Sequence, residues 1–350
     1  MFARPAHFAA VAAGLFVISA SAALAAAPIP IKVVVVTAFE IGADTGDKAG
    51  EFQAWAEAYP DSLPFPAGDR PLRYDPKNGV LVLSTGMGTP RAALSTMTLG
   101  MDPRFDLSKA YWMIAAIAGV NPNEASIGSA AWIGNLVDTD FGYEIDSREI
   151  PADWATGRIP WERSKPYQAP PSDKSSNLFV LDHGLRDWAY GVTKGITLPD
   201  NDTLKTIRAR YTAHPRAMAA PIVMTGDEAT GQTFWHGKLL NDYAEQWTRY
   251  WVGDQGRFVM TGMEDTGVAR ALGTLGKLGK ADPARLLVLR TGANYSMQAA
   301  GVTAPESLAS ENSELSALQT SLDVAYLVGR RLVDELTKGW AKYESTMPGR

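Results

Sequence analysis

The stretch Ile31-Lys32-Val33-Val34-Val35-Val36 decides the fold class, because apart from Lys32 it is an unbroken run of β-branched residues. A run that is apolar at successive rather than alternate positions predicts a strand buried on both faces, as in parallel sheets. Similar short apolar runs recur along the chain. They are Val80–Ser84, Tyr111–Ala118, Ala130–Val137, Ala220–Met224, Phe258–Met260 and Leu286–Arg290.

Helical patterns separate these runs. Arg91–Leu99 and the aromatic, amphipathic Phe234–Trp251 are two of them, and a third lies near the C-terminus behind Ser310, which we expect to be its N-cap. In that third helix the apolar residues recur every three or four positions: Leu315, Leu318, Leu322, Ala325, Val328, Leu332 and Leu336. Alternating strands and helices predict an α/β fold of three layers, with a central, mainly parallel or mixed sheet flanked by helices.

The N-terminus has the pattern of a secretory signal peptide. Arg4 precedes an apolar stretch, Phe8–Leu24, and Ala23-Leu24-Ala25 provides small residues for cleavage. We therefore expect residues 1–25 to be removed and residues 26–350 to form one soluble domain, periplasmic or secreted. The alternative is an N-terminal anchor helix, since the apolar stretch approaches the length that spans a bilayer.

Composition excludes several kinds of chemistry. Losing Arg4 would lower the 33 basic residues to 32 against 38 acidic ones, a formal net charge of −6 that argues against a nucleic-acid partner. Cysteine is absent, which rules out thiol catalysis and disulfides. Since His183, His214 and His236 are far apart in the sequence, we expect no metal site. The chain also has no Gly-x-Ser-x-Gly elbow and no Walker-type loop.

The segment Phe141–Ser176 interrupts the alternation. It carries five prolines and two tryptophans, which predicts a long ordered loop excursion rather than regular structure. Such a loop is either a lid or packing decoration.

A glycine-containing turn follows the second strand. Gly86 and Gly88 lie between a strand and a helix, where bare backbone N–H groups can hold an anion or a ligand oxygen, with Thr85 as a further donor. The other interpretation is a tight turn that needs glycine for its backbone angles.

Three further stretches carry candidate ligand contacts. Glu264 follows a short strand and can accept both vicinal hydroxyls of a ribose, with Met263 as an apolar surface for the sugar. Asn294 closes the last strand, where its amide can bond a ring nitrogen. Phe234 and Trp235 can stack on a planar base or pack in the core. Since ligands bind at the carboxyl ends of parallel strands, we expect these side chains to share one pocket with the glycine turn.

In this order the motifs resemble the purine nucleoside permease family, which is similar in pattern to nucleoside phosphorylases and methylthioadenosine nucleosidases. The stretches that carry the resemblance are Val33–Glu40, Ser84–Gly88, Ile117–Pro122, Thr225–Asp227, Phe234–Gly237, Gly262–Asp265 and Arg290–Asn294. The resemblance covers nearly all of the chain after residue 25.

The resemblance implies a nucleoside phosphorylase-like fold and a role for each residue. Glu264 would hold the ribose hydroxyls, Asn294 the purine N7, and Glu40 would be the base that activates water. Met263 would pack on the sugar and Phe234 or Trp235 on the base. Gly119 lies where many phosphorylases carry Arg and Ser for phosphate, so phosphate as co-substrate stays open and no other cofactor is expected. The superfamily also suggests a homo-oligomer.

Two functions remain after these steps. The first is an exported enzyme that cleaves the N-glycosidic bond of purine nucleosides by hydrolysis or phosphorolysis. The second is a non-catalytic nucleoside-binding component of an uptake system. A dinucleotide-binding dehydrogenase is disfavoured, because the run from Gly86 to Arg91 lacks the third fingerprint glycine.

Overall fold

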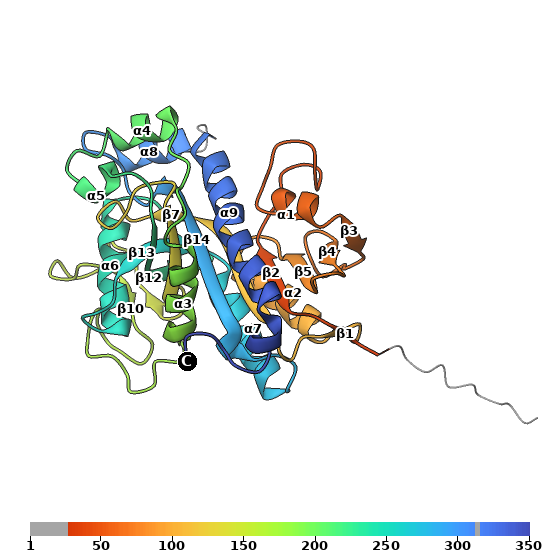
Figure 1. Cartoon of the computed structure of the whole chain (residues 1–350). Coiled ribbons are helices and arrows are strands. Elements are labelled where there is room, and N and C mark those ends of the chain that lie inside the picture. Colours follow the sequence, from red (N-terminus) through yellow and green to blue (C-terminus); the bar gives the residue numbers. More distant parts are fainter. Residues whose placement is uncertain (1–26, 312–315) are drawn as a thin grey trace, which may run out of the picture.

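The computed structural model describes residues 27–311 and 316–350 (Figure 1). The expected signal peptide, residues 1–25, lies outside the described residues. The strands are β1 (Ile29–Pro30), β2 (Val33–Thr37), β3 (Asp61–Leu63), β4 (Leu72–Asp75), β5 (Val80–Ser84), β6 (Phe105–Asp106), β7 (Tyr111–Val120), β8 (Ala130–Asp138), β9 (Tyr143–Glu144), β10 (Arg158–Ile159), β11 (Leu178–Val180), β12 (Val223–Thr230), β13 (Phe258–Gly262) and β14 (Leu286–Tyr295). Within the described residues, no helix is long and apolar enough to cross a lipid bilayer.

The helices lie between groups of strands from β2 onward. They are α1 (Gln53–Ala58), α2 (Thr89–Gly100), α3 (His183–Thr193), α4 (Asp202–Arg208), α5 (Pro215–Met218), α6 (Lys238–Val252), α7 (Asp265–Lys277), the short 3-10 helix η1 (Pro283–Arg285), α8 (Ala304–Glu311), α9 (Ser316–Lys338) and α10 (Trp340–Tyr343).

Ten of the described strands form one mixed sheet. Along it the order is β11-β8-β12-β13-β7-β2-β5-β4-β3, and β14 pairs with both β7 and β8. The strands β7, β14, β8, β12 and β13 therefore form a closed ring, in which β14 is parallel to β7 and antiparallel to β8. The open part of the sheet continues from β7 through the parallel strands β2 and β5.

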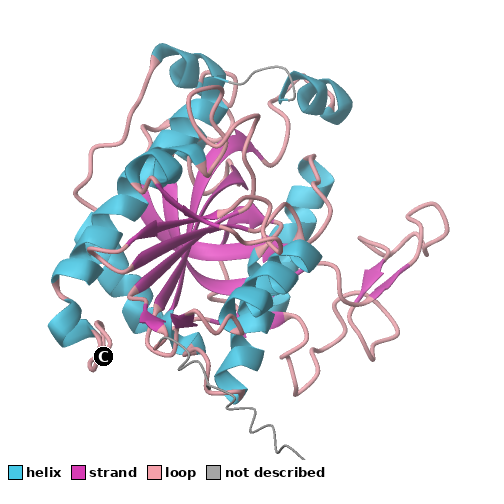
Figure 2. Cartoon of the chain, turned by 90° about the vertical axis from the view of Figure 1, so that its right-hand side faces the viewer, coloured by secondary structure: helices cyan, strands magenta, loops and turns pink. Residues whose placement is uncertain are grey.

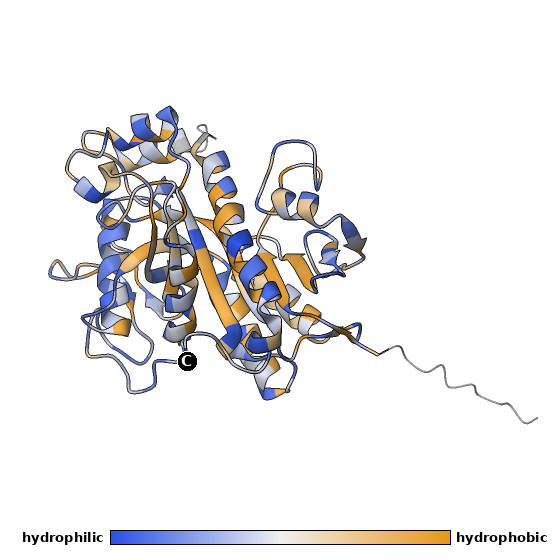
Figure 3. Ribbon diagram, in the orientation of Figure 1, coloured by the Kyte–Doolittle hydropathy of each residue, from blue (hydrophilic) through white to orange (hydrophobic). Residues whose placement is uncertain are grey.

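Side chains on successive residues of β2 reach opposite layers, as the period of a strand requires. Val34 and Val36 belong to a core shared with α2 and α7, whereas Val33 and Val35 belong to a core shared with α1, α3 and α9. Helices thus flank the sheet on both sides (Figure 2), and the blue α9 lies along β14 in Figure 1. The central strands are strongly hydrophobic (Figure 3), since both of their faces are buried. The three-layer α/β fold predicted from the alternating pattern is confirmed.

Some element boundaries differ from the predictions. The aromatic helix begins at Lys238, because Gly237 takes a positive φ of 128° and leaves Phe234 and Trp235 in the loop before it. Ser310 lies inside α8 rather than capping α9, so its prediction as an N-cap is wrong. The segment 141–176 is a loop excursion whose regular structure is the two-stranded pair of β9 and β10.

Candidate functional site

A cavity of about 310 Å³ opens where the carboxyl ends of β2, β5, β7, β13 and β14 meet. This volume is at the lower end of the ~300–1,000 Å³ that is usual for small-molecule sites. Its described lining residues come from these five strand ends, from the loops before α1, α6 and α7, and from α9. They are Ala38, Phe39, Glu51, Met87, Ile117, Ala118, Gly119, Phe234, Thr261, Gly262, Met263, Glu264, Arg290, Ala293, Asn294 and Leu318. No residue of the segment 141–176 is among them.

Glu264 lies at the first position before α7, with a carboxylate that is held from two sides. The backbone N–H of Gly88 donates to its Oε1 at 2.9 Å, and Nη2 of Arg290 donates to its Oε2 at 2.9 Å. Its side chain is buried, yet it lines the cavity. Because each carboxylate oxygen has a second lone pair, Glu264 can still accept two hydrogen bonds from a ligand.

Arg290 is the cation of a buried charge array behind this wall. Besides Glu264 it pairs with Asp265, the first residue of α7, and its Nη1 donates to the carbonyl of Ile117 at 2.7 Å. Oε2 of Glu228 in β12 lies 3.8 Å from Nε of the guanidinium. A buried guanidinium is tolerated only when its donors are occupied in this way.

Asn294 reaches the cavity through an irregularity in β14. The register between β14 and β7 shifts between Gly292 and Asn294, so that Asn294 stands opposite Gly119. A bulge of this kind re-aims the side chains that follow it. A Cβ at Gly119 would lie 3.0 Å from Oγ1 of Thr261 and 3.5 Å from Nδ2 of Asn294, so glycine keeps this corner of the cavity open. One proton of the Asn294 amide goes to the carbonyl of Tyr295 at 3.1 Å.

A narrow recess adjoins the cavity beside Asn294. Thr233, Phe234 and Trp235 line it together with Met263. Phe234 is 53 % exposed and forms part of the main cavity wall as well, so its ring is available for stacking. Trp235 is half-buried and packs against Phe258, with ring centroids 6.0 Å apart.

Two glutamates between β2 and α1 have separate roles. The carboxylate of Glu40 accepts from the backbone N–H groups of Ile41, Gly50 and Gln53, so it fastens the loop and does not line the cavity. Glu51, carried by that same loop, does line it. The structure therefore places a different carboxylate in the cavity from the one that the sequence suggested.

The Glu51 carboxyl is held by two backbone donors. The N–H of Ala38 reaches Oε2 at 2.6 Å, and the N–H of Ile117 reaches Oε1 at 2.8 Å. Burial raises its pKa from the ordinary value of 4.5 to about 8, while the positive charge of Arg290 opposes this rise and the negative charge of Glu264 adds to it. Glu51 thus takes up and gives back a proton near neutral pH.

The glycine turn supports the cavity rather than lining it with bare amides. Met87 lines the wall, but Gly86 and Gly88 do not, and the N–H of Gly88 is occupied by Glu264. Thr85 is buried, and its hydroxyl donates to the carbonyl of Gly86 at 2.9 Å. Thr85, Gly86 and Gly88 thus shape the backbone that positions Glu264.

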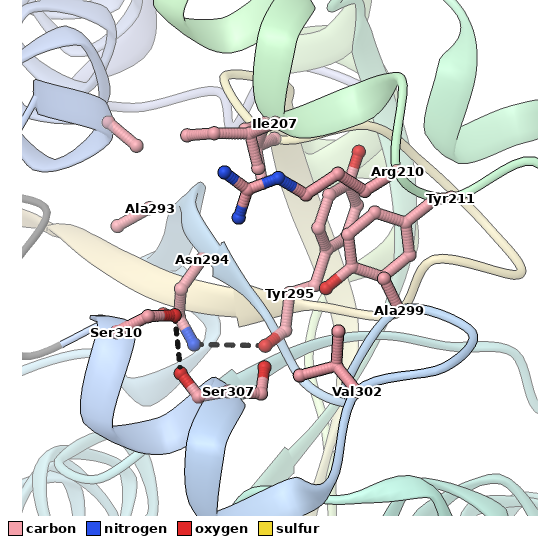
Figure 4. Close-up of a pocket in the computed structure, with 12 residues that line it drawn as sticks. Ile207, Arg210, Tyr211, Ala293, Asn294, Tyr295, Ala299, Val302, Ser307 and Ser310 are labelled. Atoms are coloured by element: carbon pink, nitrogen blue, oxygen red, sulfur yellow. Dashed lines mark hydrogen bonds between the residues drawn. The ribbon is translucent and has the colours of Figure 1, made fainter.

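A second, smaller cavity of about 80 Å³ lies on the other side of the β14 terminus (Figure 4). It shares Ala293 and Asn294 with the main cavity. Arg210 points into it from the connection after α4, and Ser307 and Ser310 of α8 form its opposite wall. Asn294 therefore stands in the partition between two hollows.

Two residues of the site were not assigned a role from the sequence. Arg290 had a detectable signal, because a cation at the end of the apolar run Leu286–Arg290 must be buried and so must be paired. Glu51 had no such signal in the sequence, since it is one acidic residue in a polar loop. Only the folded path of that loop brings it to the cavity.

Comparison of the sequence with known proteins identifies its family and several relatives. A model of the family described as purine nucleoside permease (NUP) matches residues 30–348. A Schizosaccharomyces pombe protein named as a probable purine nucleoside permease is 29 % identical over 274 residues, which cover 74 % of this chain and 76 % of that protein. A purine nucleoside permease of Candida albicans is 25 % identical over 267 residues, 75 % of this chain and 65 % of that protein.

Solved structures with a similar fold include a hydrolase and a nucleosidase. Futalosine hydrolase of Helicobacter pylori superposes with a TM-score of 0.54 at 15 % identity, over 87 % of this chain and 98 % of that chain. The 5'-methylthioadenosine/S-adenosylhomocysteine nucleosidase from Neisseria meningitidis gives 0.53 at 15 % identity, over 87 % and 99 %. These structures establish a nucleoside phosphorylase-like fold, and the match over residues 30–348 establishes that the chain belongs to the purine nucleoside permease family.

Proposed function

We propose that this protein binds a purine nucleoside in the main cavity and hydrolyses its N-glycosidic bond. The observation that carries the proposal is the meeting of Glu264, Asn294 and Glu51 in one cavity, although they come from three distant parts of the chain. A ribose-binding carboxylate, a purine-binding amide and a titratable base are the groups that this reaction requires.

The ribose would bind at Glu264. Its two oxygens each have one lone pair left after Gly88 and Arg290 are satisfied, and the 2'- and 3'-hydroxyls can donate one bond to each. Met263 would lie against the apolar face of the sugar.

The purine would extend toward the recess between Asn294 and Phe234. The side-chain amide of Asn294, which also donates to the carbonyl of Tyr295, would bond N7 of the base. Phe234 or Trp235 would cover the base from the side. Because electrons collect on the purine as the bond breaks, a donor at N7 stabilises the transition state more than the ground state.

Glu51 would serve as the general base. Its carboxylate would accept a proton from a water molecule as the water oxygen bonds to C1' of the ribose and the C1'–N9 bond breaks, with the bonding electrons passing to the purine. The proton would then leave with the purine, so that nucleoside and water give ribose and free base. The anions Glu264 and Asp265 outnumber Arg290 and would favour the positive charge that develops on the sugar.

Water is favoured over phosphate as the nucleophile. Among the described residues that line the cavity, Arg290 is the only cation, and it is already bonded to Glu264, Asp265 and the carbonyl of Ile117. The N–H of Gly88 is engaged as well. A phosphate ion would therefore meet few available donors and several carboxyl groups.

The place of action is also a proposal. The basic Arg4 and the apolar stretch 8–24 favour export, and so a periplasmic or secreted location. N-terminal sequencing of the protein isolated from the extracytoplasmic fraction would test it. A chain that is found only in the cytoplasm with Met1 in place would refute export.

The test of function is release of free base. Purified protein is incubated with adenosine or inosine, with and without inorganic phosphate, and the products are separated by chromatography. We expect equal release of base in both buffers. Release that requires phosphate would refute hydrolysis, tight binding without release would favour a nucleoside-binding uptake component, and absence of binding would refute the proposal.

The role of Glu51 has its own matched test. Since a base acts when ionised, turnover should rise with pH below about 8 and level off above it. Glu51→Gln should lower kcat by about 100-fold or more and remove this dependence. Glu57→Gln, an exposed carboxylate in α1, is the control and should change neither.

A further inference from the structure

A carboxyl group that the proposed reaction does not use lies directly behind the cavity wall. Glu228 of β12 is fully buried, and neither of its carboxyl oxygens has a hydrogen-bond donor among the described residues. A Cβ placed on the wall residue Gly262 would lie 1.8 Å from Oε1 of Glu228 and 2.7 Å from Oδ2 of Asp265. Both carboxyls thus crowd the same face of that glycine.

The backbone of β12 directs Glu228 to this position. The register of β12 against both β8 and β13 is irregular between Gly226 and Glu228, which is a bulge. The neighbouring Asp227 is turned the other way and accepts from Asn135 at 2.7 Å and from the N–H of Arg257 at 2.8 Å. A buried carboxyl placed by a bulge is a specific feature and not an accident of packing.

Burial and three charged neighbours shift the pKa of this group. The charged groups that face Glu228 are Asp265 of α7, Glu264 just before α7, and Arg290 of β14. Its strand partners Leu136 of β8 and Met260 of β13 are apolar. Burial raises the pKa of Glu228 well above its ordinary value, and the negative charge of Asp265 raises it further, against the opposing effect of Arg290. Burial and the charge of Asp265 thus both favour the uncharged form of Glu228.

We propose that Glu228 is a positioning residue for the ribose-binding carboxylate. As an uncharged acid it donates a hydrogen bond to Asp265, and the guanidinium of Arg290 stays paired with Asp265 and Glu264. Two ionised carboxylates have no proton to share, whereas one protonated carboxyl supplies the donor that this corner lacks. This inference rests on the proposed function only in that Glu264 binds the ribose.

The consequence is a device that depends on one proton. Glu228 is 3.8 Å from Nε of Arg290, so an ionised Glu228 would attract the guanidinium away from Glu264. Glu264 would then lose one of its two anchors and keep only the N–H of Gly88. The affinity for the ribose would fall although Glu228 never touches it.

The test compares Glu228→Gln, which keeps the shape and the donor, with Glu228→Leu, which removes the donor. By calorimetry at about pH 7, Glu228→Gln should bind adenosine within about twofold of the wild type, and Glu228→Leu about tenfold more weakly, a change of about 1.4 kcal/mol. Equal weakening of both variants would show that a charged carboxylate is needed and would overturn the proposal. Wild-type affinity in Glu228→Leu would overturn it as well.

A second readout does not depend on nucleoside binding. The infrared difference spectrum of wild type minus Glu228→Gln at about pH 7 should show a carboxylic-acid carbonyl band, from which the band of Glu51 cancels because both proteins retain Glu51. The difference between wild type and Glu57→Gln should show no such band. As the pH is raised, the wild type should lose affinity for adenosine relative to Glu228→Gln, and this loss should follow the disappearance of the band. Because Glu228→Gln retains Glu51, the comparison removes any effect of Glu51 on the affinity. Absence of the band would overturn the protonated Glu228 even if the protein cleaves nucleosides, and its presence would support it even if adenosine does not bind.

Discussion

The backbone N–H of Gly88 donates to Oε1 of Glu264 at 2.9 Å, across 176 positions of sequence. Gly88 has a positive φ of 96° and stands at the start of α2, and Glu264 stands at the start of α7. The two helices pack together along their length, so the contact that orients the candidate ribose carboxylate depends on how closely they approach each other.

Substitution of Gly267 tests this dependence. A Cβ there would lie 2.3 Å from the carbonyl oxygen of Thr89 in α2, so Gly267→Ala should force α2 and α7 apart. We expect a loss of about 1–3 kcal/mol in the free energy of unfolding, measured in urea, and weaker adenosine binding.

The matched control is Gly273→Ala in the same helix, where a Cβ would meet nothing within 4 Å. It should raise the free energy of unfolding by roughly 0.5–1 kcal/mol, because alanine is the better helix former, and leave adenosine affinity unchanged. Similar destabilisation by both variants would contradict the close packing of α2 on α7.

Removing the charge of Glu264 should abolish tight binding of the nucleoside. In Glu264→Gln the amide nitrogen must face either the N–H of Gly88 or the guanidinium of Arg290, and both are donors. We expect the Kd for adenosine to rise about 100-fold, since two charge-assisted bonds of roughly 1.5 kcal/mol each are lost. Calorimetry measures the Kd of this variant, with Glu57→Gln as the control. An unchanged Kd in Glu264→Gln would mean that the ribose binds elsewhere.

The buried array around Arg290 should contribute far more to stability than an exposed ion pair. Arg290→Met leaves Glu264 and Asp265 without their cation and should lower the free energy of unfolding by about 3–5 kcal/mol. Arg331→Met breaks an exposed pair with Glu335, at 3.7 Å, and should cost about 0–1 kcal/mol. Urea denaturation measures the free energy of unfolding of both variants. Equal losses of stability would contradict the burial of the ion pairs around Arg290.

Glu51 should make the protein less stable as the pH rises. Its pKa is 4.5 when exposed and about 8 in the folded chain, so between these values the folded state binds more protons than the unfolded state. The free energy of unfolding therefore falls across this window, and the loss is complete above about pH 8.

Glu51→Gln should remove that loss. The variant should gain stability relative to the wild type between about pH 5 and pH 8, as followed by urea denaturation at each pH, with Glu57→Gln showing no such trend. A constant difference at every pH would indicate that Glu51 ionises normally in the folded protein.

The fold was predictable from sequence because its strands are buried on both faces. The runs Val33–Val36 and Val80–Ser84 are apolar at nearly every position, which indicates burial on both faces. The structure has the strands β2 and β5 there. Boundaries set by single backbone angles were less visible, as at Gly237, which ends the loop that carries Phe234. Ser310 has the chemistry of an N-cap but lies within α8, because local preference does not show where a helix begins.

The site was predictable only in part, for a physical reason. Glu264 follows β13 and Asn294 lies near the end of β14, and strand ends converge, so their meeting could be expected. The choice between Glu40 and Glu51 depends on the path of an irregular loop, which no periodicity records. The inward turn of Glu228 depends on a bulge in β12, and a bulge shifts which residues face inward without leaving a mark in composition.

The last strand of the sheet, β14, lies between β7 and β8 and also carries Arg290 and Asn294. During synthesis, the chain that ends before β14 therefore has neither a complete ring nor the guanidinium that pairs with Glu264 and Asp265. On the proposed function, a chain that ends before Asn294 would lack one wall of the cavity, so nucleoside binding would begin only after about four-fifths of the sequence has been made.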